Sequence, residues 1–117
     1  DAPFSHELTD EFKSGLYIDV TTGEPLFASS RKFESRCGWP SFTKPIAKDV
    51  IRYYKDNSHG MQRVEVRSRI GNAHLGHVFE DGPSGLLRYC INGSALKFIP
   101  KNELLGTKYE YLIPYID

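Results

Sequence analysis

The chain has 117 residues, of which 39% are hydrophobic and 26% charged, a composition typical of a globular domain rather than a disordered segment. Fifteen basic residues balance fifteen acidic ones, which argues against nucleic acid or an anionic membrane as the main partner. The apolar runs are only a few residues long, whereas about 20 are needed to span a bilayer. Residues 1–117 are expected to form one domain.

The first half of the chain predicts short extended segments separated by turns. A short helix is expected from Glu7 to Lys13, with Ser5 as its cap. Strands are expected over residues 16–20, 25–27 and 50–54. The stretch from Cys37 to Phe42 is rich in Gly and Pro, so it is expected to form a loop.

The second half predicts longer strands. Residues 61–70 alternate valines with charged side chains, the period of a half-buried strand. Residues 74–79 are also extended, and residues 86–99 form the longest strand-like region, broken at Asn92-Gly93. A short helix should start near Pro100, and the tail from Tyr109 to Ile116 should form a helix or a packed arm. Many short strands with frequent turns predict a compact antiparallel β domain with minor helices.

The segment Arg88–Asn92 contains the candidate nucleophile. Side chains on a strand alternate between faces, so Arg88, Cys90 and Asn92 should share one face while Tyr89 and Ile91 point into the core. The guanidinium would favour the thiolate, which is the reactive form of cysteine. A buried cysteine beside a surface arginine is the alternative interpretation of this pattern.

Two histidines lie three residues apart, at His74 and His77. On a regular strand they would point to opposite faces, but Gly76 between them can host a bulge that turns both the same way. Beside a thiol, an imidazole can donate a proton or stabilise a thiolate. The alternatives are two surface histidines or a zinc site, although neither C-x-x-C nor H-x3-H spacing occurs.

The single tryptophan, Trp39, lies two residues after Cys37 in the expected loop. An exposed indole suits a methyl or thioether group, while a core tryptophan that anchors the loop is the alternative. A nucleophile, a second cysteine, two possible acids and an apolar wall together favour thiol redox chemistry over hydrolysis, which needs no second cysteine.

The motifs resemble those of the B-type methionine sulfoxide reductases, which reduce the R epimer of methionine sulfoxide. The similarity runs in order from about Phe4 to Pro100, and the stretches GWPSF, HLGHVF and RYCIN are jointly specific. It is carried by residues 15–20, 23–27, 37–42, 65–68, 74–79, 81–83, 88–92 and 95–96.

The resemblance implies a role for each candidate site residue. It makes Cys90 the nucleophile, Cys37 the resolving cysteine and Trp39 the wall against the sulfoxide methyl group. It places His77 and His74 around the sulfoxide oxygen, with Asp81, Arg88 and Asn92 in the same site. The implied reaction passes through a sulfenic acid on Cys90 and a Cys37–Cys90 disulfide, which thioredoxin or another dithiol reduces, with no bound cofactor. The implied fold is mainly β, with two antiparallel sheets forming a rolled, open structure with a few short helices.

The sequence departs from many members of that family at four positions. Where they carry two C-x-x-C pairs that bind a structural zinc, this chain has Asp19, Thr22, Ser68 and Gly71. The resemblance is therefore to the zinc-free members. Packing and hydrogen bonds around Asp19, Ser68 and Arg67 are expected to replace the metal.

The sequence motifs leave several interpretations of the function open. A binding module built around Trp39, a secreted structural domain with a Cys37–Cys90 disulfide and a zinc hydrolase are the rival interpretations. The chain starts without Met and shows no signal peptide, so we expect a domain of a longer protein, such as a fusion with an A-type reductase. A monomer is expected. The expected substrate is free or protein-bound methionine-R-sulfoxide. A cytoplasmic location is favoured, with an extracellular or cell-surface one if the chain belongs to a secreted fusion.

Overall fold

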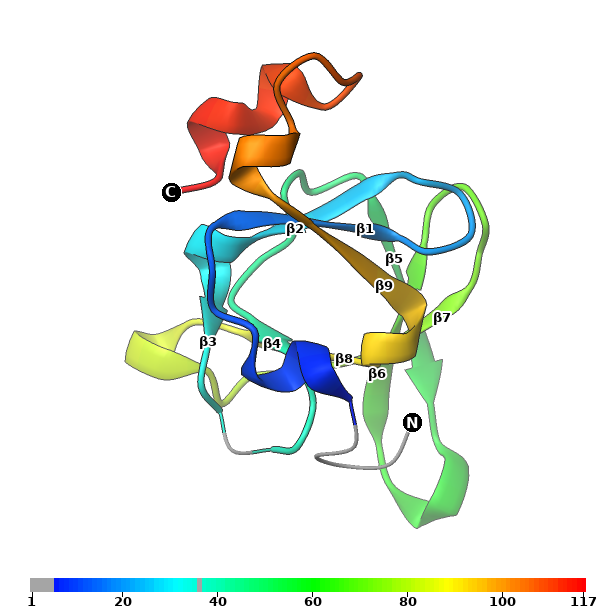
Figure 1. The fold of residues 1–117 in the computed structure, drawn as a ribbon. Coiled ribbons are helices and arrows are strands. Elements are labelled where there is room, and N and C mark those ends of the chain that lie inside the picture. The colour runs from blue at the N-terminus through cyan, green and yellow to red at the C-terminus, as the bar shows by residue number, and fades with distance from the viewer. Residues whose placement is uncertain (1–5, 36) are drawn as a thin grey trace.

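The computed structural model describes residues 6–35 and 37–117, which form two antiparallel sheets linked by short 3-10 helices (Figure 1). The small sheet has the order β2-β1-β9 and the large one the order β3-β4-β8-β7-β6-β5. The strands are β1 (Gly15–Asp19), β2 (Pro25–Ala28), β3 (Lys32–Phe33), β4 (Ser41–Phe42), β5 (Ile51–Asp56), β6 (Arg63–Ser68), β7 (His74–Phe79), β8 (Arg88–Ile91) and β9 (Leu96–Pro100). The helices are η1 (Glu7–Asp10), η2 (Ser29–Arg31), η3 (Ser58–Gly60), η4 (Pro83–Gly85), η5 (Gly93–Ala95), η6 (Lys101–Glu103) and η7 (Glu110–Tyr115). The predicted fold class is confirmed.

The main core lies between the two sheets. Tyr17 on β1 and Phe27 on β2 point into it, and Phe27 stacks on Phe42 of β4 with ring centroids 4.3 Å apart. From β8, Tyr89 and Ile91 enter the same core, as the alternation of that strand predicts. The face of β8 that carries Cys90 is therefore turned away from this core.

The central strand of the small sheet, β1, is buried on both faces because the C-terminal segment covers the outer side of this sheet (Figure 1). Leu16 and Ile18 on β1 point away from Tyr17 and pack against Leu104 and Leu112. This second cluster explains why the tail is apolar. The tail predicted as a helix or a packed arm is the 3-10 helix η7, with the fully buried Ile116 directly after it.

The alternation of β6 is only partly as expected. Val66 is fully buried, but Val64 is 38% exposed because it lies near the protruding end of the β5–β6 hairpin. The opposite face of β6 carries Arg63, Glu65 and Arg67, all of them partly buried. These charged side chains lie in the row that contains the histidines rather than on an open solvent face.

A bulge in β7 brings the two histidines together. Val66 of β6 pairs with Gly76, whereas the next residue, Arg67, pairs with His74, so Leu75 is the extra residue. The imidazoles of His74 and His77 consequently lie on one face, with ring centroids 5.4 Å apart. The expectation that a bulge at this glycine turns both histidines the same way is confirmed.

The N-terminal helix and the four positions of the expected zinc replacement also differ from the predictions in detail. Helix η1 ends at Asp10, and the ring of His6 caps it by accepting a hydrogen bond from the Leu8 amide at 3.1 Å, while the predicted cap, Ser5, lies outside the described residues.

Asp19, one of the four positions at which many B-type reductases carry zinc ligands, is held by hydrogen bonds. Its Oδ1 accepts hydrogen bonds from Thr21 at 2.8 Å (amide) and 2.7 Å (hydroxyl).

The hydrogen bonds predicted around Asp19 and Ser68 are present, but Arg67 takes no part in them. Burial opposes ionisation of Asp19, yet hydrogen bonds from Thr21, Ser68 and Thr22 outweigh it and lower its pKa. Arg67 instead donates to Glu65 and stacks on Tyr54, so it belongs to the histidine face.

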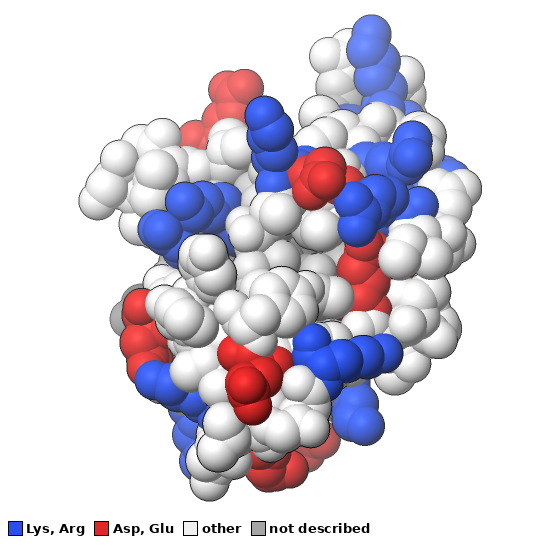
Figure 2. Space-filling view, turned by 90° about the horizontal axis from the view of Figure 1, so that it is seen from above, with Lys and Arg blue, Asp and Glu red and all other residues white. Residues whose placement is uncertain are grey.

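On the face shown in Figure 2, acidic and basic side chains lie interspersed, in keeping with the balanced composition. Within the described part of the chain, none of the helices has the length and apolar character of a membrane-spanning segment.

Gly76 provides a test of the strand packing. A Cβ atom there would overlap the carbonyl oxygen of Cys90, which is backbone and cannot move aside. We expect Gly76→Ala to lower the free energy of unfolding by about 3 kcal/mol, measured by urea denaturation. As a control, Gly60→Ala has a positive φ but open space around the new methyl group, and should cost only about 1 kcal/mol. Equal losses in both variants would contradict the close approach of β7 to β8.

Candidate active site

One cross-strand row of the large sheet assembles the candidate site. Cys90 on β8 pairs with Ser41 of β4 on one side and with His77 of β7 on the other. His77 pairs in turn with Glu65 of β6. Directly opposed residues of antiparallel strands project from the same face, so this register points all four side chains into one region.

The two cysteine sulfurs lie 2.8 Å apart. Cys90 is 8% exposed, while Cys37 is partly exposed in the loop before β4. Two hydroxyl groups surround Cys37 Sγ, from Ser35 at 3.0 Å and from Ser41 at 3.2 Å. The pairing of Ser41 with Cys90 brings the Cys37 loop to the nucleophile candidate, although the two cysteines are 53 residues apart in sequence.

The acidities of the two thiols are coupled through the hydrogen bond between their sulfurs. A hydrogen bond with Cys90 lowers the pKa of the Cys37 thiol to about 4, helped by Ser35 and Ser41 against the opposing effect of burial. The same hydrogen bond, together with burial, raises the pKa of Cys90. This coupling favours the thiolate on Cys37 and the thiol on Cys90.

A small cavity of about 190 Å³ opens above Cys90. Its lining combines aromatic surface with a few polar groups. It is lined by Trp39, Arg63, His74, Gly76, His77, Phe79, Cys90 and Asn92. The structure thus brings Trp39, both histidines, Asn92 and the Cys90 thiol to one cavity, which has the size of a single side chain rather than of a large cofactor.

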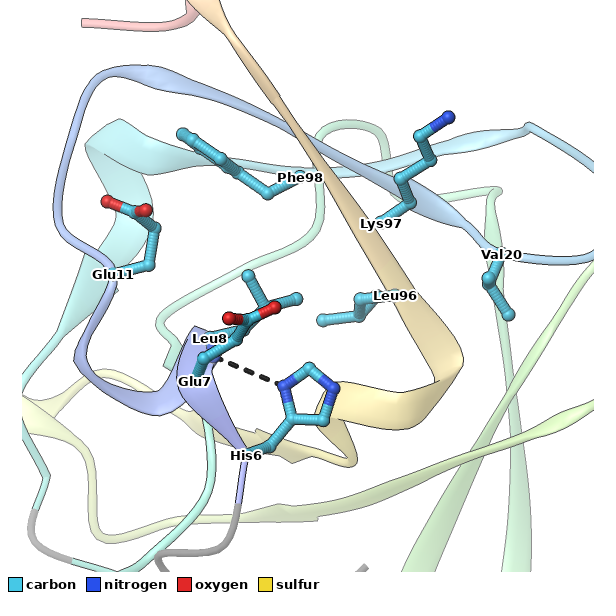
Figure 3. Close-up of a pocket in the computed structure, with 8 residues that line it drawn as sticks. All are labelled: His6, Glu7, Leu8, Glu11, Val20, Leu96, Lys97 and Phe98. Carbon is cyan, nitrogen blue, oxygen red and sulfur yellow. Dashed lines mark hydrogen bonds between the residues drawn. The ribbon is translucent and has the colours of Figure 1, made fainter.

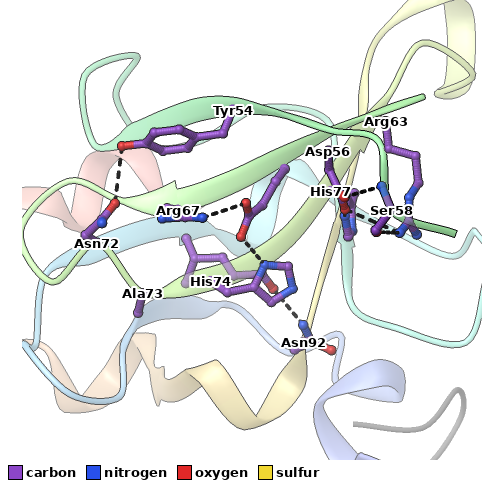
Figure 4. A network of polar contacts seen from close by, with 12 residues as sticks. Tyr54, Asp56, Ser58, Arg63, Arg67, Asn72, Ala73, His74, His77 and Asn92 are labelled. Atoms are coloured by element: carbon purple, nitrogen blue, oxygen red, sulfur yellow. Dashed lines mark hydrogen bonds and ion pairs between the residues drawn. The ribbon is translucent and has the colours of Figure 1, made fainter. Parts of the chain in front are cut away.

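Each imidazole of this cavity is hydrogen-bonded to a carboxylate (Figure 4). Glu65 lies 2.7 Å from His74 Nδ1, and Asp56 lies 2.8 Å from His77 Nε2. Asn92 donates to the carbonyl of Leu75 at 3.1 Å, next to His74. The histidines are therefore held in place rather than free at the surface.

Arg88 and Asp81 lie beside the cavity, not in its lining. Their side chains form a two-pronged ion pair, at 2.8 and 3.2 Å, and Arg88 also stacks on Phe79 at 4.3 Å. The Arg88 hydrogen bond lowers the pKa of Asp81, so that carboxylate stays ionised. The positive charge of Arg88 favours the thiolate form of Cys90, but less strongly than burial and the Cys37 hydrogen bond oppose it.

The model of the SelR domain family matches residues 1–100 of this chain. The chain belongs to the SelR family. Members of this family are the B-type methionine sulfoxide reductases, so the chain is an oxidoreductase that acts on methionine-R-sulfoxide. The family predicted from the motifs is confirmed. The residues after 100, which form η6 and η7, cover the small sheet away from Cys90.

A second cavity of about 440 Å³ lies near the N-terminal helix, between η1 and β9 (Figure 3). It is larger than the cavity at Cys90, but it contains neither cysteine nor Trp39. Across the described ranges, no three His, Cys, Asp or Glu side chains gather as a metal site would require. The cavity at Cys90, which the thiol pair adjoins, is therefore the candidate active site.

Sequence analysis missed several residues around the thiols. Arg63 and Phe79 line the cavity, Asp56 and Glu65 hold the imidazoles, and Ser41 contacts Cys37. For Arg63 and Glu65 a signal was present, because the charged half of the alternation in β6 faces the same way as the histidines. For Asp56 there was none, since it lies at the end of a hairpin strand and reaches His77 only through the sheet register.

The acidity of Cys37 predicts how it reacts. Because its pKa is about 4, Cys37 is a thiolate across pH 6–8, so its alkylation by iodoacetamide should be nearly independent of pH there. An ordinary thiol would react about 100-fold faster at pH 8 than at pH 6. The rate is measured on the reduced protein by mass mapping of Cys37.

The Cys90→Ala variant is the matched control, because it removes the largest cause of the low Cys37 pKa. Its alkylation profile should move to higher pH. A wild-type rate that climbs tenfold per pH unit would show that the hydrogen bond does not acidify Cys37.

Proposed function

We propose that this SelR domain reduces methionine-R-sulfoxide with Cys90 as nucleophile and Cys37 as resolving cysteine. The observation that carries the proposal is the position of Cys90 Sγ, at the floor of the cavity that Trp39 and both imidazoles line and 2.8 Å from Cys37 Sγ. Cys37 does not line the cavity, so a bound side chain meets Cys90 first.

The first step is reduction of the sulfoxide. As Cys90 attacks, its thiol proton passes to Cys37 and leaves the negative charge on Cys90. The thiolate of Cys90 forms a bond with the sulfoxide sulfur as the oxygen is protonated. The hydroxyl then passes to Cys90 as this sulfur–sulfur bond and the sulfur–oxygen bond of the substrate break, which leaves methionine and a sulfenic acid on Cys90. Since a sulfoxide is a poor electrophile until its oxygen is protonated, His77 or His74 supplies a proton, directly or through water.

The cavity supports the geometry of this step. A methionine side chain fits a volume of about 190 Å³, with its methyl group against the indole of Trp39 and its oxygen towards the imidazoles and Asn92. Binding of the methyl on one side and the oxygen on the other would select one epimer. Asp81 and Arg88 act from outside the cavity, where the guanidinium favours negative charge on both sulfurs.

The second step restores the thiols. Cys37 attacks the sulfur of the Cys90 sulfenic acid, the sulfur–oxygen bond breaks, and the oxygen leaves as water. A dithiol of the thioredoxin type then reduces the disulfide by exchange, attacking at the partly exposed Cys37. No bound cofactor takes part in these two steps. In this proposal the chain acts in the cytoplasm, as a monomer or as one domain of a fusion protein. Its substrate is free or protein-bound methionine-R-sulfoxide.

Two variants separate the steps. With racemic methionine sulfoxide and excess dithiothreitol, wild type should consume only the R epimer, read by chiral chromatography, and Cys90→Ser should consume none. Cys37→Ser should form one methionine per chain in a single turnover, because Cys90 and the cavity remain. It should then turn over poorly with thioredoxin, because no disulfide forms.

The same assay separates this proposal from its rivals. Retained R-sulfoxide reduction in Cys90→Ser would remove Cys90 as nucleophile. Normal cycling of Cys37→Ser with thioredoxin would remove Cys37 as resolving residue. A wild-type protein that binds substrate without thiol-dependent turnover would favour the binding module instead.

The role of His77 has its own test. If His77 protonates the sulfoxide oxygen, His77→Gln should slow sulfenic acid formation in a single turnover by roughly 10²–10⁴. His74→Gln, which changes the neighbouring ring 5.4 Å away, is the matched comparison. An unchanged rate in His77→Gln with a large loss in His74→Gln would assign the proton transfer to His74.

A further inference from the structure

We propose that Asp56 and Glu65 are positioning residues of the active site: each clamps one imidazole of the cavity through a hydrogen bond that fixes which ring nitrogen carries the proton. The inference rests on the proposed function, in which these imidazoles face the sulfoxide oxygen. The two carboxylates come from neighbouring strands, β5 and β6, and neither lines the cavity itself.

Asp56 is fixed in position by contacts other than its hydrogen bond with His77. It accepts a hydrogen bond from the Ser58 amide at 3.0 Å and forms an ion pair with Arg63 at 3.3 Å. The hydrogen bonds of Ser58 and His77 and the charge of Arg63 keep the pKa of Asp56 far below its usual range. An ionised carboxylate can only accept, so the 2.8 Å contact places the proton on His77 Nε2.

Glu65 holds His74 in the same way. Its side chain is only 14% exposed and receives a hydrogen bond from Arg67 at 3.0 Å. That bond outweighs burial and lowers the pKa of Glu65, so it too is an acceptor. The 2.7 Å contact therefore places the proton on His74 Nδ1 (Figure 4).

The two clamps act on opposite ring nitrogens. His77 is held at Nε2, which leaves Nδ1 to exchange a proton, whereas His74 is held at Nδ1, which leaves Nε2. The rings meet edge to face, with an interplanar angle of 67°. Two equivalent residues of the HLGH motif are thus given different tautomers by carboxylates that lie outside the motif.

The pH behaviour of each ring depends on every charged group that faces it. Within the part of the chain that the structure describes, those around His77 are Asp56 from β5, Arg63 and Glu65 from β6, His74 within β7, and the Cys90–Cys37 pair next to β8. Around His74 they are Glu65, Arg67 and His77. Each carboxylate is paired with an arginine, so its removal leaves an unpaired cation near the imidazole.

The pairing of each carboxylate with an arginine predicts in which direction removal of the carboxylate changes the reaction rate. In Asp56→Asn the imidazolium form of His77 loses its anion and keeps Arg63 as a neighbour, so it is disfavoured. If His77 supplies the proton, the alkaline limb of the single-turnover pH–rate profile should move to lower pH. The rate at neutral pH should fall about 10-fold. Glu65→Gln should do the same through His74 if that ring supplies the proton.

The test combines kinetics with a readout that needs no turnover. Asp56→Asn and Glu65→Gln are compared with Asp49→Asn and Glu103→Gln, which make the same chemical changes at exposed carboxylates outside the row. Sulfenic acid formation from methionine-R-sulfoxide is followed from pH 5 to 9. The ¹⁵N shifts of the imidazoles, assigned with His→Gln variants, report which nitrogen is protonated.

Wild type should show His77 protonated at Nε2 and His74 at Nδ1, and each positioning variant should mix the tautomers of its own histidine only. Unchanged ¹⁵N shifts in Asp56→Asn and Glu65→Gln would overturn the inference, even if both variants were less stable. Absence of R-sulfoxide reduction in wild type, with the tautomers as expected, would instead refute the proposed chemistry and leave the clamps intact.

Discussion

The active site depends on how closely β7 lies against β8. Only glycine fits at position 76, because any side chain there would overlap the carbonyl oxygen of Cys90. The adjacent bulge at Leu75 gives β7 one more residue than its partner β6 across this stretch. Together these two features set His77 opposite Cys90 and turn His74 to the same face. Without them the imidazoles would lie on opposite sides of the sheet.

The core side of the sheet supports that arrangement. Tyr89 and Ile91 are buried on either side of Cys90, and the hydroxyl of Tyr89 lies 2.7 Å from that of Tyr53 on β5. These contacts hold one face of β8 in the core, so that the Cys90 thiol lies on the face that borders the cavity. Among the described residues, three arginines of this face are each paired with a carboxylate: Arg63 with Asp56, Arg67 with Glu65 and Arg88 with Asp81. A charge-balanced cavity suits an uncharged, dipolar group such as a sulfoxide.

Strands β6, β7 and β8 show which structural features could be predicted from local sequence signals. The two faces of β8 and the bulge beside Gly76 were predicted, because alternation and glycine are local signals. Val64 was expected to share the burial of Val66, but periodicity cannot show where a hairpin runs past the body that it packs on. Arg67 was expected beside Asp19, yet it lies on the other face of β6, with Glu65 and Tyr54. Asp56 carried no signal, since its contact with His77 spans two strand pairings.

By itself, the sequence determined the mainly β class, the family through its GWPSF, HLGHVF and RYCIN stretches, and the residues that can do thiol chemistry. Residue type and short-range spacing are sufficient for these conclusions, because strand alternation and motif order are properties of the chain. The tertiary structure decided which cysteine is the more acidic, which carboxylate holds which imidazole, and that Arg88 and Asp81 lie beside the cavity rather than in it. Those outcomes depend on atoms brought together from distant segments, whose distances only the register between strands can set.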